Sequence, residues 1–171
     1  MIRKLFALVL FMLCTSVLAA TKPYVPQKRE FRGAWIQCVN GQFIGMSTHK
    51  MQQTLVYQLD ELQKDGVNAI FFQVRAECDA LYKSDIEPWS RFLTGQQGKA
   101  PSPYWDPLQW MIDECHKRGM ELHAWLNPYR AKTKFTSTLD PNHIAMKRPG
   151  SVFPYDGLFI LNPGQPENRK Y

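Results

Sequence analysis

The sequence lacks several features that would indicate a common class of binding site. Its 171 residues contain no run of lysine and arginine and no basic helix, although the formal net charge is +6. A nucleic-acid partner is therefore not expected. The four cysteines do not have the spacing of a zinc site, and we expect neither a metal nor a cofactor. The chain is 44% hydrophobic and 13% aromatic, which is typical of a globular protein with aromatic residues available for a binding surface.

Residues 1–20 are predicted to be a secretory signal peptide. Two basic residues precede an uncharged run over residues 5–18, and two alanines follow it. A retained membrane anchor is the alternative, although the run is short for a span of about 20 residues. Cys14 raises a lipoprotein as another alternative, but leucine precedes it where a small residue is usual. Cleavage would lower the net charge to +4, leave a leader at 21–29, and deliver the protein to the periplasm or cell envelope.

The remaining chain, residues 30–171, alternates between strand and helix patterns. Strands are predicted at 30–38, 67–74 and 120–126. The second is apolar almost without interruption, which is typical of a parallel strand covered on both faces. The order strand, helix, strand, helix, strand predicts an α/β fold with a parallel sheet.

Capping signals delimit the two predicted helices. Ser47 and Asp106 are placed as N-caps, and proline follows Asp106 in the first helical turn. Gly66 and Gly119 are placed to end the helices in the left-handed conformation. The inner helix faces carry Met51, Leu55, Leu59 and Leu62 in the first helix, and Leu108, Met111, Ile112 and Cys115 in the second.

Polar and aromatic side chains gather where the predicted strands end. Ligands of parallel α/β folds bind outside the carboxyl ends of the strands, so these ends form one candidate rim. The aperiodic segment 75–104 starts at this rim, and a connection this long is uncommon unless it has a function. The candidate substrate-binding residues are Arg75, Asp79, Tyr82, Trp89, Trp125, Asn127, Tyr129 and Arg130.

The chemistry of these residues suits a hydroxyl-rich ligand such as a sugar. Asparagine and arginine donate in fixed directions, while tryptophan and tyrosine offer flat apolar faces. Structural alternatives stand beside this interpretation. Arg75 could form an ion pair with Glu77 or Asp79, and Asn127 with its following proline could be a turn. His123 lies inside a buried strand, where we expect a core histidine.

Three cysteines follow the predicted signal peptide. Cys38 and Cys78 come after neighbouring strands and should reach the same rim, where a disulfide between them is one possibility. Cys115 lies on the apolar face of the second helix, and we expect it in the core.

The sequence contains a series of short motifs: RGAW at 32–35, FQVR at 72–75, DALYKS at 79–84, EPWS at 87–90, LTG at 93–95, HAWLNPYR at 123–130 and LNPG at 161–164. These motifs resemble those of the glycosyl hydrolase-like 10 family of bacteria. The resemblance implies the N-terminal part of a (β/α)8 barrel (a TIM barrel), about three parallel strands of which are present here. It also implies an exported protein, because some members are envelope glycosidases and one is a divisome-associated lipoprotein that cuts peptidoglycan glycan strands lacking stem peptides.

Glycoside hydrolysis usually needs two carboxylates. The rim offers Glu77, Asp79 and Glu87, of which we expect Asp79 to bind substrate or support the site and not to act in catalysis. The resemblance places the catalytic pair beyond Tyr171. Three strands are fewer than half of a barrel, and both outer strands would leave long unpaired edges. We therefore expect the domain at 30–171 to be incomplete at its C-terminus.

Three hypotheses about function remain open from the sequence. The leading one is an N-terminal fragment of an exported glycoside hydrolase-like protein acting on a cell-envelope glycan such as peptidoglycan glycan strands. The second is a non-catalytic carbohydrate-binding protein on a barrel scaffold. The third is an α/β module whose rim is an interaction surface. Contact with a membrane is expected only through the signal peptide or an anchor.

Overall fold

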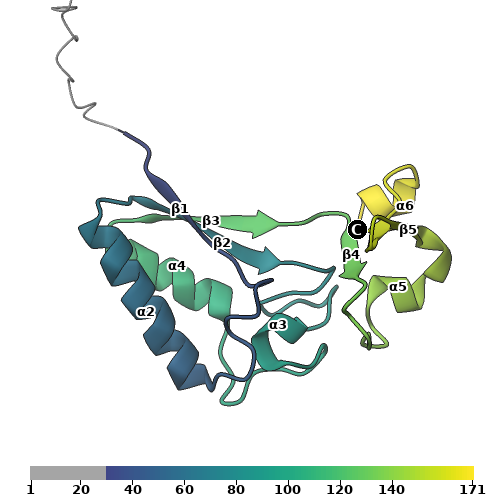
Figure 1. Ribbon diagram of the computed structural model, residues 1–171, viewed down its shortest axis with the longest axis horizontal. Coiled ribbons are helices and arrows are strands. Elements are labelled where there is room, and N and C mark those ends of the chain that lie inside the picture. Colours follow the sequence, from purple (N-terminus) through teal and green to yellow (C-terminus); the bar gives the residue numbers. More distant parts are fainter. Residues whose placement is uncertain (1–29) are drawn as a thin grey trace, which may run out of the picture. The chain divides into compact units, whose positions relative to one another are not determined.

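The computed structural model describes residues 30–171. The predicted signal peptide and leader lie outside these residues. Figure 1 shows a sheet with two long helices on one side and a second, smaller sheet near the C-terminus. Within the described part of the chain, no helix has the length and apolar character needed to cross a membrane.

The first sheet consists of three parallel strands, as predicted. β1 (Gly33–Ile36), β2 (Ala69–Arg75) and β3 (Glu121–Leu126) lie in the order β1-β2-β3, with β2 in the centre. All three carboxyl ends therefore meet at one edge of the sheet. This arrangement is compatible with part of a TIM-barrel-like fold.

The two long helices connect these strands and are capped at the predicted residues. α2 (Thr48–Lys64) begins after Ser47, whose hydroxyl accepts a hydrogen bond from a backbone N–H of the first turn. α4 (Pro107–Lys117) begins after Asp106, whose carboxylate accepts from the N–H of Gln109 at 3.0 Å. Each cap satisfies one of the N–H groups that a helix start leaves without an internal partner.

Glycine ends both helices, also as predicted. Gly66 and Gly119 have φ angles of +79° and +69°, which side chains with a Cβ rarely adopt. In both cases the next residue donates its N–H to a carbonyl of the last helical turn at 3.0 Å. This hydrogen-bonded stop turns the chain directly into the following strand.

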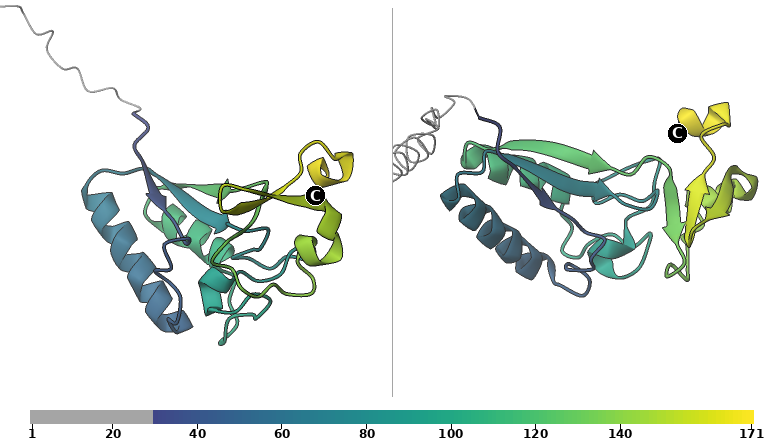
Figure 2. Two further views of the ribbon diagram at one scale, coloured as in Figure 1. Left: turned by 45° about the vertical axis from the view of Figure 1, so that its right-hand side comes forward. Right: turned by 45° about the horizontal axis from the view of Figure 1, so that its top comes forward.

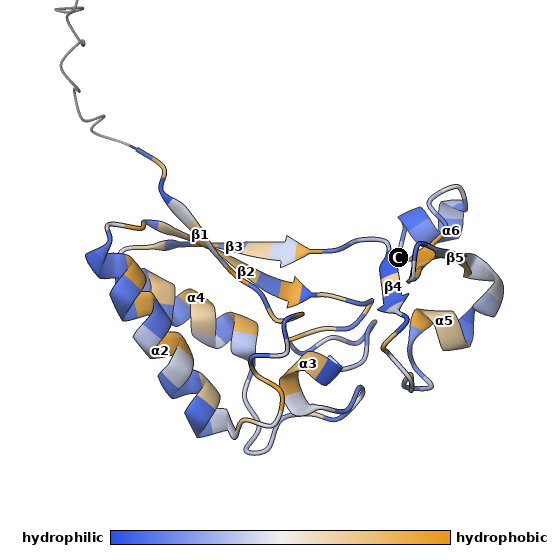
Figure 3. Ribbon diagram, viewed as in Figure 1, coloured by the Kyte–Doolittle hydropathy of each residue, from blue (hydrophilic) through white to orange (hydrophobic). Residues whose placement is uncertain are grey.

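The main core lies between the sheet and the two helices. Figure 2 shows α2 and α4 on the same face of the sheet, and Figure 3 shows apolar residues on α2 among mostly polar ones. Burial of this apolar surface is the main force that holds the helices to the sheet. The contributing residues include Ile70, Phe72 and Val74 of β2, Met51, Leu55 and Leu59 of α2, and Met111 and Cys115 of α4.

The opposite face of the sheet is partly exposed, which corrects one prediction. Trp35 is 64% exposed and stacks on Phe71 with ring centroids 4.4 Å apart, and Phe71 stacks in turn on His123. β2 itself is buried on both faces, as predicted, except at Phe71, which is partly exposed; Ala69 and Gln73 on the same face are 0% exposed. The prediction of a core histidine is wrong, because the His123 side chain is 39% exposed and lies 3.0 Å from the carboxylate of Glu121.

The long segment after β2 is ordered against the end of that strand. Leu81 donates its N–H to the carbonyl of Val74 at 2.8 Å, and Ala80 forms isolated bridges with Arg75 and Trp89. The segment then forms the short helix α3 (Arg91–Thr94), which ends at a glycine. It thus covers the carboxyl end of β2.

A second sheet, which the sequence analysis did not predict, follows β3. β4 (Arg130–Thr133), β6 (Leu158–Leu161) and β5 (Val152–Tyr155) are antiparallel, in the order β4-β6-β5. The dipeptide Asp156-Gly157 links β5 to β6, and both residues have positive φ, as a two-residue hairpin turn requires. The short helical segments nearby are α5 (Ile144–Lys147), the 3-10 turn η1 (Pro149–Ser151) and α6 (Pro166–Arg169).

Asp106 connects two parts of the fold, which gives a test of the helix start. One carboxylate oxygen caps α4 and the other accepts the N–H of Lys83 at 3.0 Å. We expect Asp106→Ala to lower the free energy of unfolding by about 1–2 kcal/mol in urea denaturation, because both N–H groups lose their acceptor. Asp113→Ala, on the exposed face of the same helix, is the control and should change stability little. Equal effects of the two variants would contradict the capping role.

Candidate functional site

A cavity of about 290 Å³ lies where the three parallel strands end. Asn40 follows β1, Glu77 follows β2, and Arg130 in β4 follows β3, so each strand is followed by a lining residue. Arg91 and Thr133 complete its polar lining. We call it the strand-end cavity. Its position is the one at which parallel α/β folds bind their ligands.

Glu77 holds this cavity together. It is 0% exposed, and its carboxylate accepts hydrogen bonds from Arg91 Nε at 3.2 Å and from the hydroxyl of Thr136 at 2.8 Å. The backbone N–H of Thr133 donates to the same carboxylate at 3.2 Å. His143 Nε2 donates to the Glu77 carbonyl at 2.8 Å, since a carbonyl oxygen can only accept. Glu77 therefore fixes α3 and the start of the second sheet to the end of β2.

Arg130 contributes a buried donor that has no acceptor within the described part of the chain. Its Nε donates to the Ala76 carbonyl at 3.0 Å, whereas its buried Nη2 has no hydrogen-bond partner there. A buried, unpaired N–H of a charged group is costly, so such a group fits a ligand oxygen. The two arginines of the cavity also face a single carboxylate, that of Glu77, which leaves an excess of positive charge.

Arg75 forms a buried ion pair, but not with either of the partners considered from the sequence. The residue is 7% exposed, and its Nε donates to both carboxylate oxygens of Glu87 at 2.8 Å. Its Nη1 donates to the backbone carbonyl of Asn127 at 2.7 Å. Burial lowers the pKa of the Arg75 guanidinium, but the hydrogen bonds and the charge of Glu87, together with the electrostatic effects of Cys78 and Tyr171, outweigh burial and raise the pKa. The guanidinium thus joins the long segment to the end of β3.

The side chain of Asn127 is held in place by its neighbours. Trp125 Nε1 donates to the Asn127 amide oxygen at 3.1 Å, and the amide nitrogen donates to the Ala76 carbonyl at 3.3 Å. The Asn127 backbone N–H also donates to the Arg75 carbonyl at 2.9 Å. These bonds join the carboxyl ends of β2 and β3 and leave the amide with a fixed direction.

Asp79 lies behind the cavity surface. It is buried, and its carboxylate accepts from the Glu77 backbone N–H and from Gln97 Nε2, both at 3.1 Å. Burial raises the pKa of this carboxyl. Its expected role, to bind substrate or to support the site, stays a prediction.

The predicted aromatic residues Tyr82, Trp89, Trp125 and Tyr129 are not among those that line the strand-end cavity. Tyr82 and Trp89 are half-buried against the main core, and Trp89 meets Tyr104 edge to face at 6.1 Å. Tyr129 packs on a smaller core cluster under the second sheet. Of the eight predicted residues, Arg130 lines the strand-end cavity, while Arg75, Asp79, Trp125 and Asn127 support the strand ends around it.

Cys38 and Cys78 are both buried free thiols, so the possible disulfide between them is not formed. Cys38 instead donates its backbone N–H to the side-chain oxygen of Gln73 at 3.1 Å. Burial raises the pKa of both thiols, which keeps them protonated. Across residues 30–171, the structure brings together no group of three or more acidic, histidine or cysteine side chains that could hold a metal ion.

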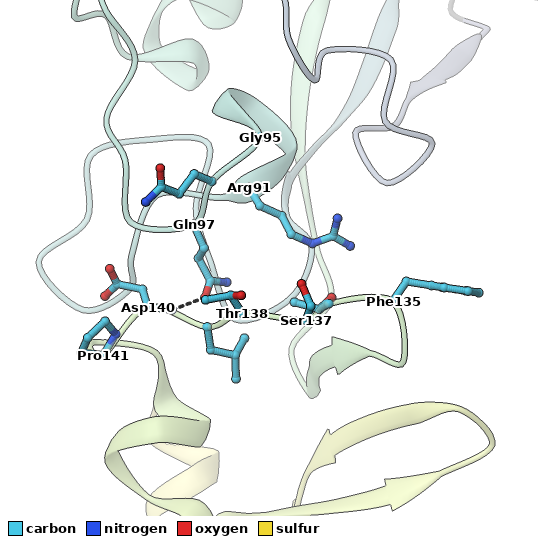
Figure 4. A pocket seen from close by; sticks show the side chains of 11 residues that line it. Arg91, Gly95, Gln97, Phe135, Ser137, Thr138, Asp140 and Pro141 are labelled. Carbon is cyan, nitrogen blue, oxygen red and sulfur yellow. Dashed lines mark hydrogen bonds between the residues drawn. The ribbon is translucent and has the colours of Figure 1, made fainter.

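A second cavity, of about 480 Å³, lies beside α3. Figure 4 shows its walls, formed by the segment after α3 and by residues 135–141 after β4. Arg91 and Phe135 line this cavity and the strand-end cavity as well. We call it the loop cavity. The sequence analysis missed both shared residues. Arg91 lies in the segment 75–104 and Phe135 in the segment after β4, and neither segment has a periodic pattern.

A parallel sheet with a polar, cationic cavity at its strand ends defines an α/β protein equipped to bind a polar ligand there. The chain belongs to the glycosyl hydrolase-like 10 family, whose model matches residues 30–171. This confirms the resemblance drawn from the motifs.

Two curated relatives show how much of a family member the chain represents. Glycosyl hydrolase YngK of Bacillus subtilis is 41% identical over 149 residues, which is 84% of this chain and 29% of that protein. Glycosyl hydrolase DigH of Escherichia coli strain K12 is 43% identical over 126 residues, which is 68% of this chain and 28% of that protein. The chain thus spans less than a third of the length of these relatives.

The ion pair of Arg75 and Glu87 gives a test of the site's architecture. We expect Arg75→Met to lower the free energy of unfolding by about 3–5 kcal/mol, because Glu87 would remain buried without its cation. Lys64→Met removes an exposed ion pair with Glu61 and is the control, which should change stability little. Chemical denaturation measures both variants. An Arg75→Met variant as stable as the wild type would show that the buried pair is not structural.

Proposed function

We propose that this chain is the glycan-binding N-terminal part of an exported glycoside hydrolase that acts on a cell-envelope glycan such as peptidoglycan glycan strands. The observation that carries the proposal is the strand-end cavity with the unpaired donor of Arg130. Membership of a glycosyl hydrolase-like family supports a glycan as the ligand. The predicted signal peptide supports a location in the periplasm or cell envelope.

The role proposed for the described residues is to hold the sugar. Arg130 Nη2 would donate to a sugar oxygen, and Asn40 beside it offers an amide that can both donate and accept. Glu77 is engaged by three donors, so its proposed role is to position Arg91 and the cavity walls. In this proposal the strands form part of a (β/α)8 barrel, and the catalytic carboxylates lie in the part of the protein that follows Tyr171.

A non-catalytic carbohydrate-binding protein is the second candidate. A different observation favours it: the carboxylates near the strand-end cavity already have partners within the described residues, Glu77 with Arg91, Glu87 with Arg75, and Asp79 with Gln97. The whole protein encoded by the gene, incubated with purified peptidoglycan glycan strands, separates the two candidates. New reducing ends support the hydrolase, binding without new reducing ends supports the binding protein, and no binding contradicts both.

Arg130 is the residue whose replacement tests the binding site. We expect Arg130→Gln to weaken binding of glycan strands roughly 10- to 100-fold, because a charged donor worth about 1.5–3 kcal/mol is lost. Arg130→Lys keeps the charge without the forked donors and should give an intermediate loss. Lys170→Gln removes a positive charge from an exposed residue that does not line the cavity, and it is the control. Isothermal titration calorimetry measures the affinities, and equal affinity for Arg130→Gln and wild type would exclude Arg130 from the site.

A further inference from the structure

We propose that the loop cavity is a second glycan-binding subsite. In this proposal Phe135, at the boundary between the loop cavity and the strand-end cavity, is a platform against which a sugar ring packs. The inference rests on the proposed function and extends it, because two adjoining subsites require an extended glycan chain as the ligand. Arg91 and Phe135 line both cavities, so the two hollows are neighbours that share a boundary. Figure 4 shows Phe135 at one end of the loop cavity, on the side to which the Arg91 side chain points.

The walls of the loop cavity are built from fixed groups. Gln97 is buried, its side-chain oxygen accepts the N–H of Asp140 at 2.9 Å, and its amide nitrogen donates to Asp79 at 3.1 Å. On the other wall, buried Thr136 is tied to Glu77 at 2.8 Å. A site whose walls are fixed before binding loses less freedom when a ligand enters.

A glycine allows these two walls to approach each other. Gly98 has a φ of +82°, and a Cβ at this position would lie 1.9 Å from a carboxylate oxygen of Asp140. No other residue type fits there without moving Asp140, which lines the cavity. Figure 4 shows Asp140 at the end of the cavity away from Phe135.

The lining has the mixed character that a neutral sugar requires. Gln96, Ser137 and Thr138 are exposed and offer an amide and two hydroxyl groups, which can donate to and accept from sugar hydroxyls. The only charged lining residues, Arg91 and Asp140, are of opposite sign, so the lining carries no net charge. The loop cavity is thus suited to an uncharged sugar residue.

Phe135 supplies the apolar surface that the polar groups lack. It is 78% exposed, so its ring adds little to the packing of the fold. The ammonium group of Lys134 lies 5.2 Å from the ring centroid. A large exposed aromatic ring beside hydroxyl and amide groups matches the C–H face and the hydroxyl edge of a sugar ring.

The test compares two lengths of ligand on the whole protein encoded by the gene. A disaccharide and an octasaccharide from peptidoglycan glycan strands are titrated by calorimetry under conditions that prevent cleavage. The wild type should bind the octasaccharide more tightly than the disaccharide. Phe135→Ala should weaken octasaccharide binding roughly tenfold, because the ring lies at the boundary of the two cavities. Gln96→Ala, at a residue that lines the loop cavity and not the strand-end cavity, should weaken octasaccharide binding and leave disaccharide binding unchanged, because the shorter ligand fits within the strand-end cavity.

Tyr155→Ala is the control, because Tyr155 is also a highly exposed aromatic residue and lines neither cavity. Equal wild-type affinity for the two lengths, or an unchanged octasaccharide affinity in Phe135→Ala, would overturn the second subsite and leave the proposed function standing. If neither ligand binds the wild type, the proposed function fails and the subsite with it.

Discussion

One buried carboxylate, that of Glu77, determines how the parts of this protein meet. It follows the central strand and is hidden from solvent, where an unpaired charge would be strongly unfavourable. Arg91 of α3, the backbone of Thr133 in β4 and the hydroxyl of Thr136 all donate to it. The end of β2, the helix α3 and the start of the second sheet are thereby brought to one point. Removing any of these donors would leave part of the charge without compensation.

The binding surfaces follow from this constraint. The strand-end cavity lies next to Glu77, and its second arginine, Arg130, donates to the Ala76 carbonyl and keeps a buried donor without a partner in the described residues. The loop cavity lies beyond Arg91, where the chain continues from Thr136 to Asp140. The same network therefore holds the protein together and leaves donors over for a ligand. That combination is the physical basis of the glycan-binding account.

Local sequence signals predicted the first sheet and its helices, because N-caps, glycine stops and apolar periodicity act within a few residues. The end of β3 was also recognised as part of the candidate site. The partner of Arg75 could not be predicted, since four carboxylates follow it, of Glu77, Asp79, Asp85 and Glu87, and only the folded segment selects Glu87. The second sheet has strands of four residues, too short for a periodic pattern. Its one local signal was the Asp156-Gly157 turn, which could have indicated the hairpin.

The central claim is that a sugar occupies the strand-end cavity. A crystal structure of the whole protein with a bound glycan oligosaccharide tests it most directly. The account predicts a sugar ring in the cavity, with one of its oxygens within hydrogen-bond distance of Arg130 Nη2. A sugar bound elsewhere on the protein, with only water beside Arg130, would contradict it.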